Sequence, residues 1–316
     1  MKEISNNQHS SHYDYEIDLR ELFFVLWNGK KLIISITAVF ALVAVFYSLS
    51  LPDKYRSTTV VSSAQGGGGG TLSGALGQLG GIASFAGVNI GGGESSEAQV
   101  AKEIMRSRWF IEEFIRKNNL ALEVFAVQGW DKDSNQLEIN SNVYDVESSL
   151  WVQDAVSGKI LEPTGWELYE TFSGMFTVSE DERSGLMSIS VEYFSPEIAK
   201  KWVDLLIIGI NQHMQSRKLN KVNLNIQYLE AQIQKTTSAE MREVFYTIIE
   251  EQIKSKMLAE ASPEYAFVTV SPAMVPVEKF EPKRSTICIL LTLLGGIIAV
   301  LFVLARHFIF NINGKK

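Results

Sequence analysis

The chain is 316 residues long, carries a net charge of −7, and is 46% hydrophobic with a single cysteine. The negative charge excludes the basic footprint of a nucleic-acid-binding protein, and one cysteine cannot form an internal disulfide. The length leaves room for one domain with a real core, or for one domain and an extended arm.

Two uncharged apolar runs of membrane-spanning length lie near the ends of the chain, at Leu32–Leu51 and Ser285–Ala305. Each can cross a hydrocarbon core of roughly 30 Å as a helix. Both ends of the chain are therefore expected in the same membrane. The predicted organisation is a cytoplasmic tail at 1–31, transmembrane helices at 32–51 and 285–305, an extracytoplasmic domain at 52–284, and a short cytoplasmic tail at 306–316.

The basic flanks set the expected orientation. Lys30-Lys31 precede the first span and Arg306 follows the second, and short basic flanks stay in the cytoplasm. Lys283-Arg284, on the opposite side of the second span, weaken this signal. A cleaved signal peptide is the alternative for the first span, but its length and the lack of a small-residue cleavage site favour an uncleaved anchor.

Before the first span, residues 17–27 have apolar side chains near helical spacing, and Asp18 could cap this helix. An interface anchor ending at Trp27 is favoured over a helix that docks a partner. The membrane lipid is thus an expected partner.

A glycine-rich segment spans Gln65–Gly93. It contains neither a G-K-[ST] motif nor a lysine, which argues against a phosphate-binding loop. A flexible loop and a segment that becomes ordered against a neighbour both remain open.

The soluble part predicts a mixture of helices and strands. A helix is expected from Ser95 or Ser96 to about Lys117, and a short one over 163–172. Residues 175–180 and 186–194 read as a hairpin. The β-branched runs at 55–63 and 266–271 follow one span and precede the other, so they are expected to pair and close the domain at its base.

The longest helical pattern begins at Ser195-Pro196 and continues to about Glu260, with 235–238 as a possible break or bend. A continuous helix would be about 97 Å long. No core formed by the remaining residues could bury it. Part of the helix is therefore expected to project and to pack on another copy or a partner.

Catalytic motifs are not evident. His213 has no Cys, Asp or Glu at ligand spacing, so a surface histidine is favoured over a metal ligand. The carboxylates lie in predicted turns or on polar faces, although a pair acting as in glycosidases stays open. We expect no enzyme activity, no cofactor and no metal. Gly295 and Gly296 allow close helix packing, either on Ala38 or Ala41 of the first span or between subunits.

Prolines recur in the segment 271–283 that leads into the second span, at Pro272, Pro276 and Pro282, followed by Lys283. Proline continues neither a helix nor a central strand, so an extended strap is expected. With residues 18–27, 52–63 and 80–87, the strap makes the chain resemble the bacterial polysaccharide co-polymerases, the Wzz-type chain-length determinants. Glu281 stands where serine is usual in that family.

The resemblance implies an α+β fold: a mixed sheet at the membrane-proximal base, a long projecting helix, and assembly into a homo-oligomeric ring in the inner membrane. It also implies a non-enzymatic role. Such proteins set the chain length of O antigen or a related glycan, together with a separate polymerase and the growing lipid-linked glycan.

Three hypotheses from different classes follow. The leading one is a scaffold that regulates polysaccharide chain length, most of all that of O antigen. The second is an export subunit for capsule or exopolysaccharide, or an adaptor for a tyrosine kinase on a separate chain, since no kinase domain is expected on this one. The third, a periplasmic ligand sensor, is disfavoured because the tail after the second span is too short for an output domain.

Overall fold

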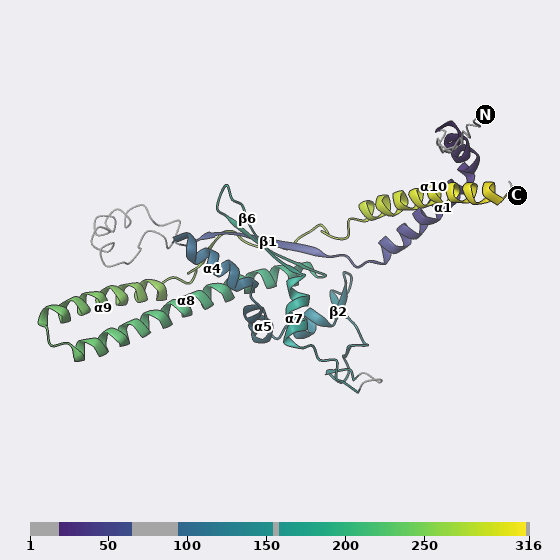
Figure 1. Ribbon diagram of the computed structural model, residues 1–316. Coiled ribbons are helices and arrows are strands. Elements are labelled where there is room, and N and C mark those ends of the chain that lie inside the picture. The colour runs from purple at the N-terminus through teal and green to yellow at the C-terminus, as the bar shows by residue number, and fades with distance from the viewer. Residues whose placement is uncertain (1–18, 65–93, 154–157, 314–316) are drawn as a thin grey trace, which may run out of the picture. The chain divides into compact units, whose positions relative to one another are not determined.

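The computed structural model describes residues 19–64, 94–153 and 158–313. The chain divides into two compact units (Figure 1). One unit combines the two ends of the chain, up to Leu51 and from Pro282, and the other is Pro52–Glu281. The polar tail, the proposed cap at Asp18 and the glycine-rich segment at 65–93 lie outside the described residues.

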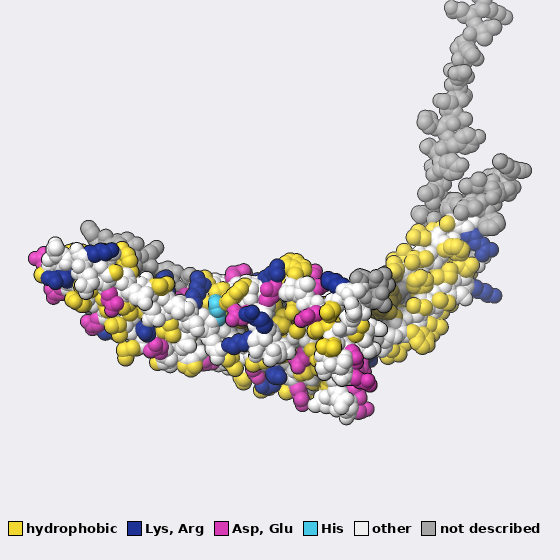
Figure 2. Space-filling model, turned by 90° about the horizontal axis from the view of Figure 1, so that it is seen from below, with side chains coloured by type: hydrophobic (Ala, Val, Ile, Leu, Met, Phe, Trp, Pro, Cys, Tyr) yellow, Lys and Arg dark blue, Asp and Glu magenta, His cyan; other side chains and the backbone are white. Residues whose placement is uncertain are grey.

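The terminal unit consists of two long helices, α1 (Leu19–Ser50) and α10 (Arg284–Asn313). By length and composition, Phe24–Ser50 and Arg284–Arg306 could each cross a membrane. The helices pack antiparallel, because Gly29 lies against Val303 and Gly295 lies against Phe40. Much of the apolar surface of the pair faces outward (Figure 2), as expected for helices that lie in lipid.

The second unit is built on a four-stranded sheet with the order β6-β7-β1-β8. The strands are β1 (Tyr55–Ser63), β6 (Phe176–Glu180), β7 (Met187–Tyr193) and β8 (Phe267–Ser271). The expected hairpin of β6 and β7 is confirmed, as is the pairing of the two β-branched runs as β1 and β8. The α+β class is confirmed too. The expected mixed sheet is wrong in one respect, since all three strand pairs are antiparallel.

The core lies between this sheet and the helices packed against it. The largest fully buried side chains include Trp202, Tyr193 and Phe172. The first half of α8 (Pro196–Lys235) supplies Trp202, Val203, Leu206 and Ile210 at helical spacing, and it packs on β1 and β7. Burying this face removes a large apolar area from water, the main favourable term in folding.

The helix predicted to run to Lys117 is two helices, α4 (Glu94–Arg106) and α5 (Arg108–Lys117). The break falls at Ser107, whose hydroxyl accepts a hydrogen bond from the Phe110 N–H at 3.3 Å and caps α5. The restart turns the side chains of α5 toward the core, where Phe110, Ile111, Phe114 and Ile115 are buried.

Short elements connect α5 to the sheet. They are α6 (Ala121–Phe125), β2 (Val127–Asp131), β3 (Gln136–Ile139), β4 (Tyr144–Asp145), β5 (Leu150–Trp151) and α7 (Gly165–Ser173). The helix α7 begins with a reciprocal capping box between Thr164 and Glu167, close to where the sequence predicted it.

The long helix expected over 196–260 is broken between Thr236 and Ser238, within the stretch 235–238 that the sequence marked as a possible break or bend. The chain forms two helices instead, α8 and α9 (Ala239–Glu260), which lie side by side (Figure 1). Thr236 ends α8 in an extended conformation, and the Ser238 hydroxyl caps α9 by accepting from the Met241 N–H at 3.3 Å. Hydroxyl side chains compete with the helix for backbone hydrogen bonds, so they favour a break at this point.

A buried amide connects the helical hairpin to the sheet. Asn211 of α8 is 3% exposed. Its side-chain oxygen accepts from the N–H groups of Ala266 and Phe267 at 2.8 and 2.9 Å, and its amide donates to the Phe267 carbonyl at 3.0 Å. Beside it, Gln215 donates to the carbonyls of Ala259 and Ser262. These bonds fix where α9 ends and β8 begins.

Candidate functional site

The proline-rich strap between β8 and α10 is held along β1 by side chains as well as by backbone. The hydroxyls of Ser57 and Thr59, which are 1% and 2% exposed, donate to the carbonyls of Met274 and Ser271 at 2.9 Å. Proline has no N–H for a regular ladder. Side-chain donors on β1 therefore replace part of the strand pairing.

At its far end the strap is joined to the start of β1. Lys54 donates its N–H to the Glu281 carbonyl at 2.8 Å and accepts from the Phe280 N–H at 2.8 Å. The exposed ammonium of Lys279 lies 3.3 Å from the carboxylate of Asp53. The two ends of unit 2 are thus held together next to Leu51 and Pro282, where the chain continues into the terminal helices.

Arg56 is the centre of this closure. Its guanidinium stacks on the Phe280 ring, with 3.4 Å from the charged carbon to the ring centroid, and its Nε donates to Glu192 of β7 at 3.0 Å. A second guanidinium nitrogen pairs with the same carboxylate. One planar side chain therefore connects the strap to two strands, which a lysine could not do. We call Arg56, Glu192 and Phe280 the strap clamp.

The two glycines predicted to allow close packing have different surroundings. A Cβ on Gly295 would come within 2.4 Å of Phe40 Cβ, so only glycine fits against that side chain of α1. A Cβ on Gly296 would find only the Thr37 hydroxyl, at 3.9 Å. Close packing on the first helix is thus present at Gly295, where the nearest atoms belong to Phe40.

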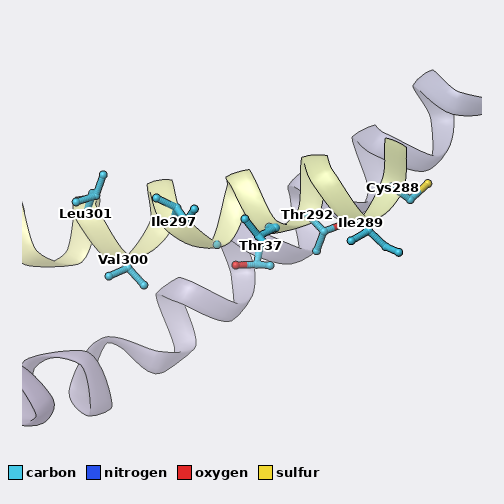
Figure 3. Close-up of a pocket in the computed structure, with 9 residues that line it drawn as sticks. Thr37, Cys288, Ile289, Thr292, Ile297, Val300 and Leu301 are labelled. Atoms are coloured by element: carbon cyan, nitrogen blue, oxygen red, sulfur yellow. The ribbon is translucent and has the colours of Figure 1, made fainter. Parts of the chain in front are cut away.

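Gly296 instead opens a groove of about 800 Å³ along α10. Figure 3 shows Thr37 of α1 among the side chains of α10 that line it. Except for the Thr37 and Thr292 hydroxyls and the Cys288 thiol, its side chains are aliphatic. Such a groove suits an acyl chain or another helix packed in lipid.

The helical hairpin has an outer half with little cover. Beyond Met214, the buried residues of α8 are Val222 and Ile233. Large apolar side chains of both helices are instead exposed, among them Leu224, Tyr228, Tyr246, Met257 and Leu258 at 60–66%. The pairing of α8 with α9 therefore leaves many apolar side chains in contact with water. Large exposed apolar patches mark interaction sites.

The predicted site residues do not converge on one point. Pro272 and Pro276 lie in the strap of unit 2, whereas Pro282 and Lys283 belong to the terminal unit and lead into α10. The Lys283 carbonyl accepts the N–H of Ile287 at 3.2 Å, which starts the helix. Gly295 and Gly296 lie further along α10. Among the described residues, no group of three or more His, Cys, Asp or Glu could hold a metal ion.

Sequence reasoning missed the strap clamp. Arg56 reads as one polar position in a β-branched strand, and its partners lie 136 and 224 positions further along the chain. The alternation of the strand places Arg56 on the face opposite Ser57, but no local signal identifies Phe280 or Glu192 as its partners. The pairing of the β-branched runs was the available clue that the strap would lie beside β1.

Comparison with known proteins finds similarity to chain length determinants. Residues 15–118 match the family model described as Wzz, chain length determinant protein. The chain length determinant protein of Escherichia coli K12 aligns over 100% of both chains at 22% identity. The chain is thus similar to Wzz-type chain length determinants, in the family model over residues 15–118 and in a full-length relative at 22% identity.

A second relative resembles only part of this chain. The tyrosine-protein kinase etk of Escherichia coli K12 is 44% identical over 69 residues, which is 22% of the chain but only 10% of the kinase. Among solved structures, a full-length bacterial polysaccharide co-polymerase matches 93% of this chain and 99% of its own at 15% identity, with a TM-score of 0.38. A fragment of WzzB from Salmonella Typhimurium gives 14% identity and a TM-score of 0.28, over 73% of this chain and all of the fragment.

Proposed function

We propose that this protein is a non-enzymatic scaffold in the bacterial inner membrane that regulates the chain length of lipopolysaccharide O antigen. It acts with a separate polymerase and the growing lipid-linked glycan. The observation that carries the proposal is the alignment with a chain length determinant over the full length of both chains. The backbone hydrogen bonds between Lys54 and the end of the strap support this proposal. They hold both ends of unit 2 beside the segments that enter the two apolar helices.

In this proposal α1 and α10 span the inner membrane and both termini are cytoplasmic. The domain at 52–284 then lies in the periplasm, where an O-antigen polymerase delivers its product. The basic residues Lys30, Lys31 and Arg306 at the outer ends of the helices support this orientation.

We also propose that the protein forms a homo-oligomeric ring through the helical hairpin. Leu224 and Tyr228 are 66% and 65% exposed and lie one turn apart on α8. A second copy is a natural cover for this apolar face, because a heterologous contact, in which this face meets a different surface of the next copy, can close into a ring.

The experiment is a deletion of the gene, followed by electrophoresis of the lipopolysaccharide. The expected result is that the modal cluster of long O-antigen chains disappears and that a plasmid copy restores it. A ladder that keeps its modal cluster in the deletion strain would reject the proposal for O antigen.

A second candidate has one observation in its favour. The 44% identity to a part of the kinase etk points toward an export or kinase-adaptor role for capsule or exopolysaccharide. In that case the deletion would leave the O-antigen ladder intact. It would instead reduce the amount or the size of capsule or exopolysaccharide, measured by extraction and gel filtration.

A further inference from the structure

An exposed tryptophan lies on the outer face of α5. The core-facing residues of this helix are Phe110, Ile111, Phe114 and Ile115, so helical geometry places Trp109 on the other side. Its side chain is 56% exposed, and its ring meets the His213 ring of α8 at 5.0 Å between centroids and an angle of 56°. The indole ring is thus fixed against a neighbour while most of it faces solvent.

Trp109 forms part of two adjacent grooves. One, of about 620 Å³, lies between α5 and α8 and includes Glu113, Asn118, Gln212 and His213. The other, of about 520 Å³, lies between α5 and α7 and includes Glu113, Arg116 and Asn119. Trp109 and Glu113 line both. Both volumes are in the range of small-molecule sites. We call them the Trp109 grooves.

The lining combines one aromatic surface with carboxylate and amide groups. In the larger groove, Lys117 donates to the Gln212 side-chain oxygen at 3.2 Å, which orients that amide. Trp130 and Trp202 each donate their indole N–H to a side-chain oxygen. Within the described part of the chain, Trp109 donates to no such group. It therefore keeps a donor for a ligand.

Burial favours the uncharged form of the His213 ring. Burial lowers the pKa of His213. The charge of Glu113 acts in the opposite direction and raises this pKa, whereas the charge of Arg217 lowers it further. A neutral imidazole both donates and accepts hydrogen bonds. The groove between α5 and α8 is thus lined by one acid, one lysine and neutral polar groups, a poor match for a phosphate or another polyanion.

We propose that the Trp109 grooves bind a sugar residue of a glycan chain. A pyranose ring has a face of C–H groups that packs on an aromatic ring and an edge of hydroxyls that pairs with carboxylates and amides. This is the combination that Trp109 and Glu113 offer, with Asn118 and Gln212 on one side and Asn119 on the other. The inference rests on the proposed function, which supplies a glycan beside the domain.

The test is a binding measurement on the full chain in detergent. The probe is the polysaccharide released by mild acid from the lipopolysaccharide of the strain that carries the gene, and saturation-transfer NMR reports binding. Trp109→Ala is expected to weaken binding about tenfold or more, because it removes the aromatic ring on which the sugar packs. Trp109→Phe, which keeps a ring, is expected to retain an intermediate affinity.

Trp166→Ala is the matched control. Trp166 is 53% exposed and lies on α7 nearby, but it lines neither of the two grooves. The Trp166→Ala protein is expected to bind the polysaccharide probe as the wild type does. Equal binding by wild type and Trp109→Ala, or equal loss in both alanine variants, would overturn the proposal. So would a Trp109→Ala protein that changes its size on a blue-native gel, because the surface would then be a subunit contact.

The two proposals fail in different ways. If the wild type does not bind the probe but gene deletion removes the modal cluster, the sugar site is wrong and the chain-length role stands. If Trp109 is needed for binding but deletion leaves the O-antigen ladder unchanged, the sugar site stands and the O-antigen role is wrong.

Discussion

Three surface turns of this protein use the same arrangement of residues. Each begins with an aspartate whose carboxylate accepts from the N–H two positions on, at 3.0–3.1 Å, and from a serine hydroxyl three positions on, at 2.6–2.7 Å. The fifth residue of each turn has a positive φ, between 53° and 67°. The turns are 131–135, 145–149 and 181–185. The fifth residues are Asn135, Ser149 and Gly185.

The fifth position predicts opposite effects of two substitutions. Glycine adopts a positive φ without cost, whereas other residues lose roughly 1 kcal/mol there. A Cβ on Gly185 would meet nothing within 4 Å, so Gly185→Ala tests backbone strain alone. We expect it to destabilise by about 1 kcal/mol and Ser149→Gly to stabilise by a similar or smaller amount. Thermal unfolding in detergent measures both. Equal melting temperatures for Gly185→Ala and wild type would contradict the assignment.

The aspartates of the same turns predict a pH dependence. Hydrogen bonds from serine and from the backbone lower the pKa of Asp131, Asp145 and Asp181. A carboxylate with a lowered pKa stabilises the fold above its unfolded pKa of about 4, and this contribution is lost as the pH falls through the folded value. A triple Asp→Asn variant should therefore lose less of its melting temperature than wild type between pH 6 and pH 3. An identical loss would show that other groups govern acid unfolding.

At the scale of elements, the sequence predicted what depends on periodicity and local capping. The β6–β7 hairpin, the pairing of β1 with β8 and the helix α7 all came from alternation, β-branched composition or a turn cluster. The break at 235–238 was visible only as a possibility. Whether Thr236 ends the helix depends on α9 finding a surface on α8, and bonds such as that from Gln215 to Ala259 join positions far apart in sequence.

The candidate sites were harder to predict for the same reason. The strap could be recognised from its prolines, but the strap clamp depends on Phe280 and Glu192 reaching Arg56 from different elements. Trp109 reads locally as one more apolar residue of a helix. Only the break at Ser107, which sets the rotation of α5, determines that it faces outward.

The strap clamp predicts that charge alone does not replace Arg56. Arg56→Lys keeps a cation beside Glu192 but loses the planar stack on Phe280 and the two-point pairing, so we expect a loss of about 1–2 kcal/mol. The strap should also loosen, seen as faster hydrogen exchange at the Phe280 N–H, which bonds to Lys54. Lys279→Ala, which removes a more exposed ion pair, is the control and should cost at most about 0.5 kcal/mol. Equal exchange in the two variants would argue against the clamp.

At the scale of the whole chain, one physical problem remains after folding. The first half of α8 is covered by the sheet, but the outer hairpin exposes Leu224 and Tyr228 of α8 and a set of apolar side chains on α9. A 40-residue helix is about 60 Å long, more than one small core can cover. The chain folds back as α9, which covers part of α8. Apolar side chains of both helices stay exposed, so a partner is still needed to cover them.

The proposed oligomer should depend on this face. Leu224→Glu combined with Tyr228→Glu introduces two charges into a contact that would have to desolvate them, while leaving the buried Val222 in place. We expect the detergent-extracted protein to shift on a blue-native gel from a large assembly to a much smaller species, with its helix content unchanged by circular dichroism. Gln227→Glu adds a charge at an exposed polar position on the same helix and should leave the assembly intact. If the double variant keeps the wild-type size, the hairpin does not hold the subunits together. If the wild type itself is a monomer, there is no assembly for the hairpin to hold.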